Sequence, residues 1–499
     1  MTILPRKKYI GRLPAIIIVL AWLGVMGILV ARQRVTRLGP QSGEIPPAFL
    51  EEQWATILFH GQKIGWGHSE YQPVPGGYRV IGESRMSIVA MGVKQDARIN
   101  FTSEVSPEFF LKKISFEFHS TAQNIKVDGE VNDLTLHISL RSPEDAKPEE
   151  RTITLKEPVS LLDTMAIRAA KMGLKEGERF KIPVFDPTTQ SADYVNVEVA
   201  GREEIESMGK RVKAYVIKTN FLGVEVKSWI DDEGRTLRDE SPLGFVTELA
   251  SKADALRVES AAKLDMIAAA AIPADRNIPE PRNLRYLKAR LSGLENIEAP
   301  ALEGGVQSLQ KEGEGPNMIL TVRIPDPGPG YELPNREPAV ESFLRSELLL
   351  QSDDPEIISA SKNIIQGEQN SIKAAQLLND WLYQHIEKAP TLTLPSAKEV
   401  WNTKKGDCNE HTALYTALAR AAGIPARMAV GVVYLDGAFY YHAWPEIWLG
   451  QPGWAPVDPT FGEFPADATH IRLAIGGLKD QLAITRFLGK LKIDIIEMQ

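Results

Sequence analysis

Cys408 is the only cysteine among the 499 residues of the chain, and its surroundings are those of a reactive thiol. It follows Asp407, a preferred N-cap residue, and opens the run 408–421, in which Leu414 and Leu418 share one helical face. The partial positive charge at a helix N-terminus stabilises a thiolate, and free backbone N–H groups there can receive a developing oxyanion. A lone cysteine is often a plain buried apolar residue, so a nucleophile also requires a base.

His442 and Asp458 could supply that base and the group that orients it. His442 lies in a strand-like run that follows the hairpin dipeptide Asp436-Gly437, and Asp458 ends the next strand-like run. With a loop of four residues between these strands, the two side chains would fall on opposite faces of the sheet. A bulge near Pro445, or a loop one residue longer or shorter, would put them on the same face.

These motifs carry a resemblance to a known family. The segments GDCNEHTALYTALARAAGIPAR, HAW and W-x-P-V-D-P-T resemble the core of the transglutaminase-like superfamily, whose bacterial members are often described as candidate cysteine proteases. The resemblance covers about residues 350–470. It implies a papain-like arrangement of helices on an antiparallel sheet. It further implies that Cys408 is the nucleophile, His442 the base and acid, and Asp458 the orienter of a thioester-forming triad.

Tryptophans near these motifs have two interpretations. Family enzymes place a side-chain donor near the oxyanion, and Trp401, seven residues before Cys408, is the candidate here, although packing of the short helix is the preferred interpretation of this residue. Trp444 and Trp454 are candidates for walls of a substrate groove, with core packing as the alternative.

A metal site is the competing interpretation of the same region. Cys408 and His411 have a C-x-x-H spacing, which His442, Asp458 or His470 could complete. No second cysteine or paired histidine motif accompanies them, so we predict no metal and no cofactor, and a structural role for His470.

The N-terminus reads as a membrane anchor. The nineteen residues from Leu13 to Ala31 carry no charge and would span roughly 28 Å as a helix, close to the hydrocarbon thickness of a bilayer. A cleaved signal peptide is the alternative, although a cut after Ala31 would leave bulky Leu29 three residues before it. Four basic residues precede the span and three follow it, so we expect a cytoplasmic N-terminus and an extracytoplasmic main body, periplasmic or on the cell surface.

The charge of the main body argues against a nucleic-acid partner. Seven basic residues and no acidic one lie within the first 37 positions, which leaves 50 basic against 65 acidic residues, a formal charge of −15. A single thiol also excludes an intramolecular disulfide framework. The partners we expect are therefore a protein or peptide substrate and, through the N-terminal helix, the membrane. The oligomeric state stays open.

The hydrophobic patterns along the whole chain predict an α+β protein with several domains. We expect an anchor over 1–38, an antiparallel β-rich region over 45–250 that could form two subdomains, a mixed and proline-rich linker region over 251–345, the catalytic domain over 346–475 and a C-terminal strand segment over 476–499. Helix-like runs interrupt the β regions at 160–174 and 260–271.

Two functions from different classes follow. The first is a membrane-anchored thiol hydrolase or acyl transferase acting on peptide or glutamine carboxamide bonds, with His442 holding the Cys408 thiolate as an ion pair. The second is a non-catalytic envelope binding or scaffold protein that uses the β-rich region.

Overall fold

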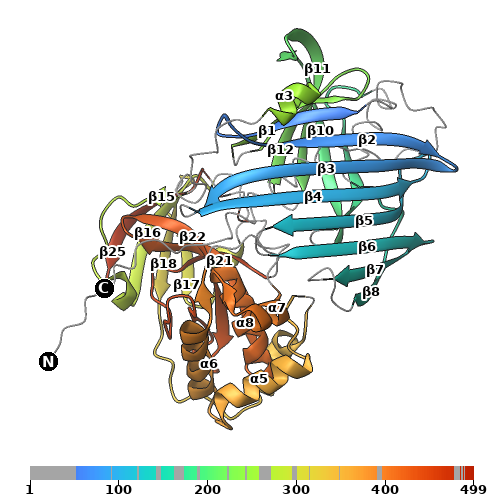
Figure 1. Ribbon diagram of the computed structural model, residues 1–499. Coiled ribbons are helices and arrows are strands. Elements are labelled where there is room, and N and C mark those ends of the chain that lie inside the picture. Colours follow the sequence, from blue (N-terminus) through green and yellow to red (C-terminus); the bar gives the residue numbers. More distant parts are fainter. Residues whose placement is uncertain are drawn as a thin grey trace. The chain divides into compact units, whose positions relative to one another are not determined.

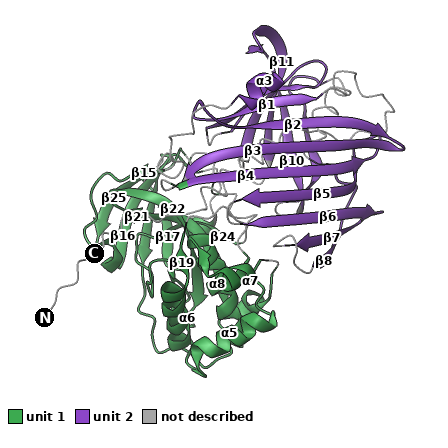
Figure 2. Ribbon diagram, viewed as in Figure 1, with its two compact units in different colours: residues 1–19, 90–93, 265–499 green, residues 20–89, 94–264 purple. Residues whose placement is uncertain are grey.

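The computed structural model describes residues 52–499 with gaps at 91–92, 121–122, 142–147, 162–173, 188–190, 222–223, 242–243, 258–270, 295–299, 314, 348, 390–395, 477–483, 485–486 and 488. The described residues divide into two compact units, coloured separately in Figure 2. One unit holds 52–89 and 94–264, and the other holds Ala90, Val93 and 265–499. The fold is α+β: a large antiparallel sheet comes first in the chain, and the helices and smaller sheets follow it.

The first unit is built on a single antiparallel sheet of fourteen strands, in which neighbours in sequence are mostly neighbours in space. Its strand order is β8-β7-β6-β5-β4-β3-β2-β1-β14-β13-β12-β11-β10-β9, so the β1–β14 pair joins two meanders. The strands are β1 (Gln53–Phe59), β2 (Gln62–Val74), β3 (Gly77–Ala90), β4 (Val93–Val105), β5 (Leu111–Ser120), β6 (Asn124–Asn132), β7 (Thr135–Arg141), β8 (Glu149–Thr154), β9 (Arg179–Asp186), β10 (Ser191–Ser207), β11 (Lys210–Phe221), β12 (Val224–Ile230), β13 (Thr236–Glu240) and β14 (Phe245–Ala250), followed by helix α3 (Lys252–Leu256).

Buried and exposed side chains alternate along these strands. In β7, for example, Leu136, Ile138 and Leu140 are buried, whereas their neighbours in the strand are half-buried or exposed. A period of two residues places one face of each strand against a core and leaves the other face to solvent.

The second unit contains three sheets and the longer helices (Figure 1). A five-stranded sheet has the order β15-β22-β21-β24 with β23 paired to β22, a four-stranded sheet has the order β17-β18-β16-β25, and β19 and β20 form a parallel pair. Its strands are β15 (Ile272–Pro273), β16 (Tyr286–Ser292), β17 (Gln307–Lys311), β18 (Met318–Arg323), β19 (Glu387–Lys388), β20 (Lys405–Gly406), β21 (Ala426–Leu435), β22 (Ala438–Trp448), β23 (Trp454–Pro456), β24 (Ile471–Ile475) and β25 (Lys492–Met498). Its helices are α5 (Pro355–Ile365), α6 (Ser371–His385), α7 (Ala397–Thr403) and α8 (Cys408–Ala421), with 3-10 turns η3 (Pro281–Asn283), η4 (Pro300–Leu302) and η5 (Pro338–Leu344).

Two segments predicted to lie outside the catalytic domain belong to its compact unit. The linker region expected over 251–345 contributes β16, β17 and β18 to the four-stranded sheet. The C-terminal strand β25 pairs with β16 in the same sheet, from Leu287↔Met498 to Ser292↔Lys492. The two proline-rich runs that suggested a linker lie before β16, at 272–282, and after β18, at 325–338.

Helix α8 is the buried centre of the second unit. All its residues from Cys408 to Arg420 are buried, and it packs against α5, α6 and α7 and against β21 and β22. Leu414, Leu418 and Ala417 join the main hydrophobic cluster of this unit. A helix that is buried all round has little freedom to shift, so its N-terminal residue is held in place by packing.

Several expectations from sequence fall on residues outside the described ones. These are the span from Leu13 to Ala31 and most of the helix-like runs 160–174 and 260–271. Among the helices of the described part of the chain, none has the length and apolar character needed to cross a membrane.

Candidate functional site

The predicted helix start at Cys408 is confirmed, and its cap is more complete than expected. Cys408 is the first residue of α8, and the Asp407 carboxylate accepts a hydrogen bond from the Asn409 backbone N–H at 3.1 Å. Glu410 completes a capping box, because its Oε2 accepts from the Asp407 N–H at 2.9 Å. The thiol is 1% exposed, so this helix end is fixed and closed off from solvent in the structure.

The predicted hairpin packs β22, the strand that carries His442, against helix α8. Asp436 and Gly437 both have positive φ, 46° and 92°, as a two-residue turn between right-handed twisted strands requires. His442 lies in β22, opposite Gly431 of β21. The next residue, Ala443, makes a hydrogen bond from its backbone to the Cys408 thiol.

The loop between β22 and β23 settles the register that brings Asp458 toward His442. Trp448 pairs with Trp454, so the loop is one residue longer than the four-residue alternative, and the pairing continues with a bond from the Val457 N–H to the Pro445 carbonyl at 2.9 Å. In this register Asp458 falls on the same face of the sheet as His442.

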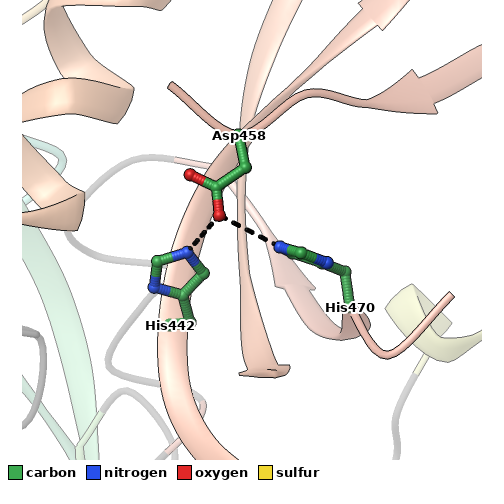
Figure 3. Close-up of side chains that lie close together, drawn as sticks. All are labelled: His442, Asp458 and His470. Carbon is green, nitrogen blue, oxygen red and sulfur yellow. Dashed lines mark hydrogen bonds and ion pairs between the residues drawn. The ribbon is translucent and has the colours of Figure 1, made fainter. Parts of the chain in front are cut away.

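Figure 3 shows the resulting arrangement: His442 and His470 approach the Asp458 carboxylate from two sides. His442 Nε2 lies 2.7 Å from Asp458 Oδ2, and His470 Nε2 lies 3.1 Å from the same oxygen. The other oxygen, Oδ1, accepts from the backbone N–H groups of Thr460 and Phe461 at 2.7 and 3.1 Å. All three side chains in Figure 3 are buried, and the carboxylate is held by four hydrogen bonds.

These contacts fix the tautomer of His442. A carboxylate oxygen can only accept, so Nε2 carries the proton in the bond to Asp458. Nδ1 is buried and has no hydrogen-bond partner among the described residues. The unpaired nitrogen of a neutral His442 can therefore accept a proton, and the Phe461 ring is stacked on the imidazole 5.0 Å away, with the planes 19° apart.

Burial favours an uncharged Cys408 and His442 in this closed structure. Desolvation raises the pKa of the Cys408 thiol well above its usual value, and the nearby Asp407, Glu410 and Asp458 charges raise it further. Desolvation also lowers the pKa of His442, and this effect exceeds the opposing effect of Asp458. The ion pair expected from sequence is thus disfavoured here, because burial and two acidic side chains at the helix cap outweigh the helix N-terminus.

His470 is the part of this network that sequence reasoning missed. It was expected to be structural, yet it shares the Asp458 oxygen with His442 and also approaches Asp467, with Nδ1 3.2 Å from the Asp467 backbone oxygen. Arg282 completes the group, since its Nη1 lies 2.6 Å from Asp467 Oδ2 and 3.2 Å from Glu463 Oε1. Nothing in the sequence pattern links Arg282 to residues some 180 positions later.

The three tryptophans proposed from sequence lie in different places. Trp401 stacks on Trp381 at 5.2 Å and lies under the Lys404 ammonium, and its role as an oxyanion donor stays a prediction. Trp444 is buried and stacks against His442 at 6.1 Å, whereas Trp454 packs on Trp448 and beneath Arg427. Their roles as groove walls also stay predictions.

A metal ion fits this cluster poorly. His442, Asp458 and His470 bring three potential ligand atoms within 4.8 Å of one another. However, zinc bonds of about 2.0–2.1 Å in a tetrahedral site hold ligand atoms about 3.3 Å apart. The 2.7 Å between His442 Nε2 and Asp458 Oδ2 is the spacing of a hydrogen bond instead.

Several buried polar atoms around this site have no hydrogen-bond partner among the described residues. Among the described residues, the side-chain amide of Asn409, next to Cys408, and the indole N–H of Trp444 are buried and make no hydrogen bond, like His442 Nδ1. Buried polar groups are almost always satisfied, and exceptions cluster where a ligand or water completes them.

In this α+β unit, Cys408 begins helix α8, and His442 of β22 is hydrogen-bonded to the buried Asp458 carboxylate. Residues 358–459 match the model of the Transglutaminase-like superfamily, and residues 55–249 match DUF3108, a protein family of unknown function. The chain therefore contains a transglutaminase-like core domain that follows a β-sheet domain of the second family.

Parts of the chain are also similar in sequence to known proteins. A protein-glutamine gamma-glutamyltransferase of Pseudomonas aeruginosa is 34% identical over 95 residues, 17% of this chain and 14% of that protein. An uncharacterized protein of Haemophilus influenzae is 28% identical over 180 residues, 30% of this chain and 47% of that protein. The chain thus spans less than half the length of either relative.

A solved structure of a candidate cysteine protease from Cytophaga hutchinsonii aligns with 18% identity and a TM-score of 0.29, covering 43% of this chain and 86% of that one. A structural likeness this low has no bearing on the function of the chain.

Proposed function

We propose that the protein is a membrane-anchored thiol enzyme that breaks peptide or glutamine carboxamide bonds through a thioester on Cys408. The observation that carries the proposal is the 2.7 Å bond from His442 Nε2 to the buried Asp458 carboxylate, which leaves Nδ1 as an unpaired base. A base fixed in one tautomer and oriented by a carboxylate is what a thiol nucleophile requires.

The first half of the reaction forms the thioester. Because burial favours a neutral thiol and a neutral imidazole, His442 Nδ1 takes the Cys408 proton as sulfur attacks the carbonyl carbon. Backbone N–H groups at the start of α8 stabilise the oxyanion, with Trp401 as a candidate additional donor. His442 then gives its proton to the leaving amine, the carbon–nitrogen bond breaks, and ammonia or an amine departs.

The second half decides the product. Water attacks the thioester in a hydrolase, and a lysine or another amine attacks it in a cross-linking enzyme, with His442 removing the proton from either nucleophile. We propose hydrolysis as the main outcome. The distant relation to a glutamyltransferase keeps amine transfer as a measurable second product.

Access to the thiol requires a local opening. Cys408 is 1% exposed and His442 is fully buried, so a peptide carbonyl reaches the sulfur only if neighbouring groups move. The unpaired amide of Asn409 and indole N–H of Trp444 are candidate donors to the bound peptide.

The location that we propose follows the sequence. Residues 13–31 anchor the chain, with the two described units outside the cytoplasm. Fractionation of cells that express the full chain should find it in the membrane pellet, and a variant lacking residues 1–37 should be soluble. Recovery of the full chain in the soluble fraction would refute the anchor.

Alkylation of the full chain by iodoacetamide tests whether His442 acts as the base. At pH 7, Cys408 should react at least about ten times faster in the wild type than in His442→Gln, because glutamine cannot accept the thiol proton. His411→Asn is the matched control, since His411 is a second buried histidine three residues after Cys408, and its rate should equal that of the wild type. Equal rates in the wild type and His442→Gln would instead favour the scaffold alternative.

A further inference from the structure

His470 has contacts that only a doubly protonated imidazole can make. Its Nε2 lies 3.1 Å from Asp458 Oδ2. Its Nδ1 lies 3.2 Å from the backbone oxygen of Asp467 and 3.6 Å from Oδ1 of the same residue. Carbonyl and carboxylate oxygens are acceptors, so both ring nitrogens must donate, and a ring that donates from both nitrogens is an imidazolium.

The balance of charges around His470 leads to the same conclusion. The titratable groups that face it are Asp458 and Asp467 directly, with His442 beyond the first and Arg282 and Glu463 beyond the second. Desolvation and, to a smaller extent, the charge of buried Asp467 raise the pKa of Glu463 to about 8, so this carboxyl is mostly neutral at pH 7. Two carboxylates then face one guanidinium, and a charged His470 is the cation that balances them.

We infer that His470 is a permanently charged positioning residue that fixes Asp458 between two histidines and weakens the affinity of His442 for a proton. His470 acts on the base through Asp458, since the two imidazoles donate to the same oxygen, 2.7 and 3.1 Å away, and through its charge, since the two ring centroids lie 5.7 Å apart. Part of the carboxylate charge is thereby neutralised, and His442 stays an unprotonated base at neutral pH. The catalytic significance of this effect rests on the function proposed above.

The electrostatics of the cluster agree with this arrangement. The carboxylates of Asp467 and Asp458 outweigh desolvation and raise the pKa of His470 to about 10, while the His470 charge is among the causes that lower the pKa of His442. Trp444 lies edge-to-face with His470 at 5.1 Å and stacks against His442, so an apolar wall lines both rings. The role assigned to His470 differs from that of the metal ligand or core histidine considered from sequence.

Selective ¹⁵N labelling of the eight histidines in the full chain tests the charge directly. The His470 ring, assigned by its loss in His470→Gln, should show two protonated nitrogens from pH 6 to pH 9. A His470 ring that loses a proton near pH 6.5, the ordinary value, would overturn the inference. This measurement needs no substrate, and a variant is needed only to assign the His470 signals. If His470→Gln does not fold, Asp467→Asn can replace it, because loss of the Asp467 charge should visibly lower the midpoint of the His470 titration.

The same spectra test the effect on His442. His470→Gln keeps a donor for Asp458 and removes the charge, so the midpoint of the His442 titration should rise by at least about one pH unit, a tenfold change in proton affinity. His411→Asn, which removes a histidine that binds the Asp407 carbonyl instead, should leave that midpoint unchanged. An unchanged His442 midpoint in folded His470→Gln would reduce His470 to a packing role. If the wild type and His442→Gln reacted equally fast with iodoacetamide while His470 still showed two protonated nitrogens, the result would contradict the proposed enzymatic function and leave the charge of His470 standing.

Discussion

At the scale of single residues, the site separates three buried histidines by the partners of their ring nitrogens. His442 has one acceptor and one empty nitrogen, His470 has two acceptors, and His411 donates Nδ1 to the Asp407 carbonyl at 2.6 Å while its Nε2 has no partner among the described residues. We therefore propose three roles for the same kind of side chain in one core: His442 as a base, His470 as a cation and His411 as a neutral structural group. The hydrogen-bond partners of the ring nitrogens distinguish the three histidines.

His411 gives a prediction for stability in acid. Desolvation lowers the pKa of His411 to about 4 in the folded chain. The unfolded chain protonates this histidine below about pH 6.5, whereas the folded chain does so only near pH 4. Stability is consequently lost as pH falls from 6.5 toward 4. His411→Asn keeps a donor for the Asp407 carbonyl and does not titrate.

Between pH 7 and pH 4.5, the wild type should lose about 2.5 kcal/mol more unfolding free energy than His411→Asn, as measured by urea denaturation. If the two proteins lost equal stability over this range, His411 would have to be protonated or accessible in the folded state.

At the scale of elements, a β-bulge sets how closely β24 approaches the hairpin that carries His442. The register between β21 and β24 shifts between Val430 and Gly431, and a Cβ on Gly431 would lie 1.9 Å from the Ile471 carbonyl oxygen. Only glycine lets the two backbones come this close. His470 precedes β24 directly, so this contact also holds it near Asp458.

Gly431→Ala should therefore destabilise the fold by about 1–3 kcal/mol or more, because the strands must separate. Gly315→Ala is a control for the substitution itself, since the nearest atom to its Cβ would be 3.8 Å away. Thermal unfolding of both variants checks this, and equal melting temperatures would show that the bulge relaxes without cost.

Local elements of the site could be predicted from sequence, and their long-range pairings could not. Asp407 and Asp436-Gly437 have the residue types of a helix cap and a tight turn, and both predictions are confirmed. The loop after β22 could close in more than one register, and hydrophobic alternation fits either, so only the pairing of Trp448 with Trp454 decides where Asp458 points. The partners of His470 come from separate segments, which periodicity does not connect.

At the scale of the whole molecule, the residues proposed for chemistry lie in only one of the two compact units. The sheet of the first unit buries alternating side chains and holds none of the residues proposed for chemistry, which all lie in the second unit. The β strands could be predicted from alternation and turn residues. Their joining into a single fourteen-stranded sheet depends on the β1–β14 pair, between segments almost 200 residues apart.

The most direct measurement follows the fate of a glutamine side chain. The full chain would be incubated with casein whose lysines are methylated, together with a fluorescent amine, and ammonia release, amine incorporation and peptide cleavage would be recorded. We predict at least one of these products from the wild type, with its rate reduced about a thousandfold or more in Cys408→Ala and His442→Gln. The same rate in Cys408→Ala, or no product from the wild type alongside an unreactive thiol, would contradict the enzymatic account.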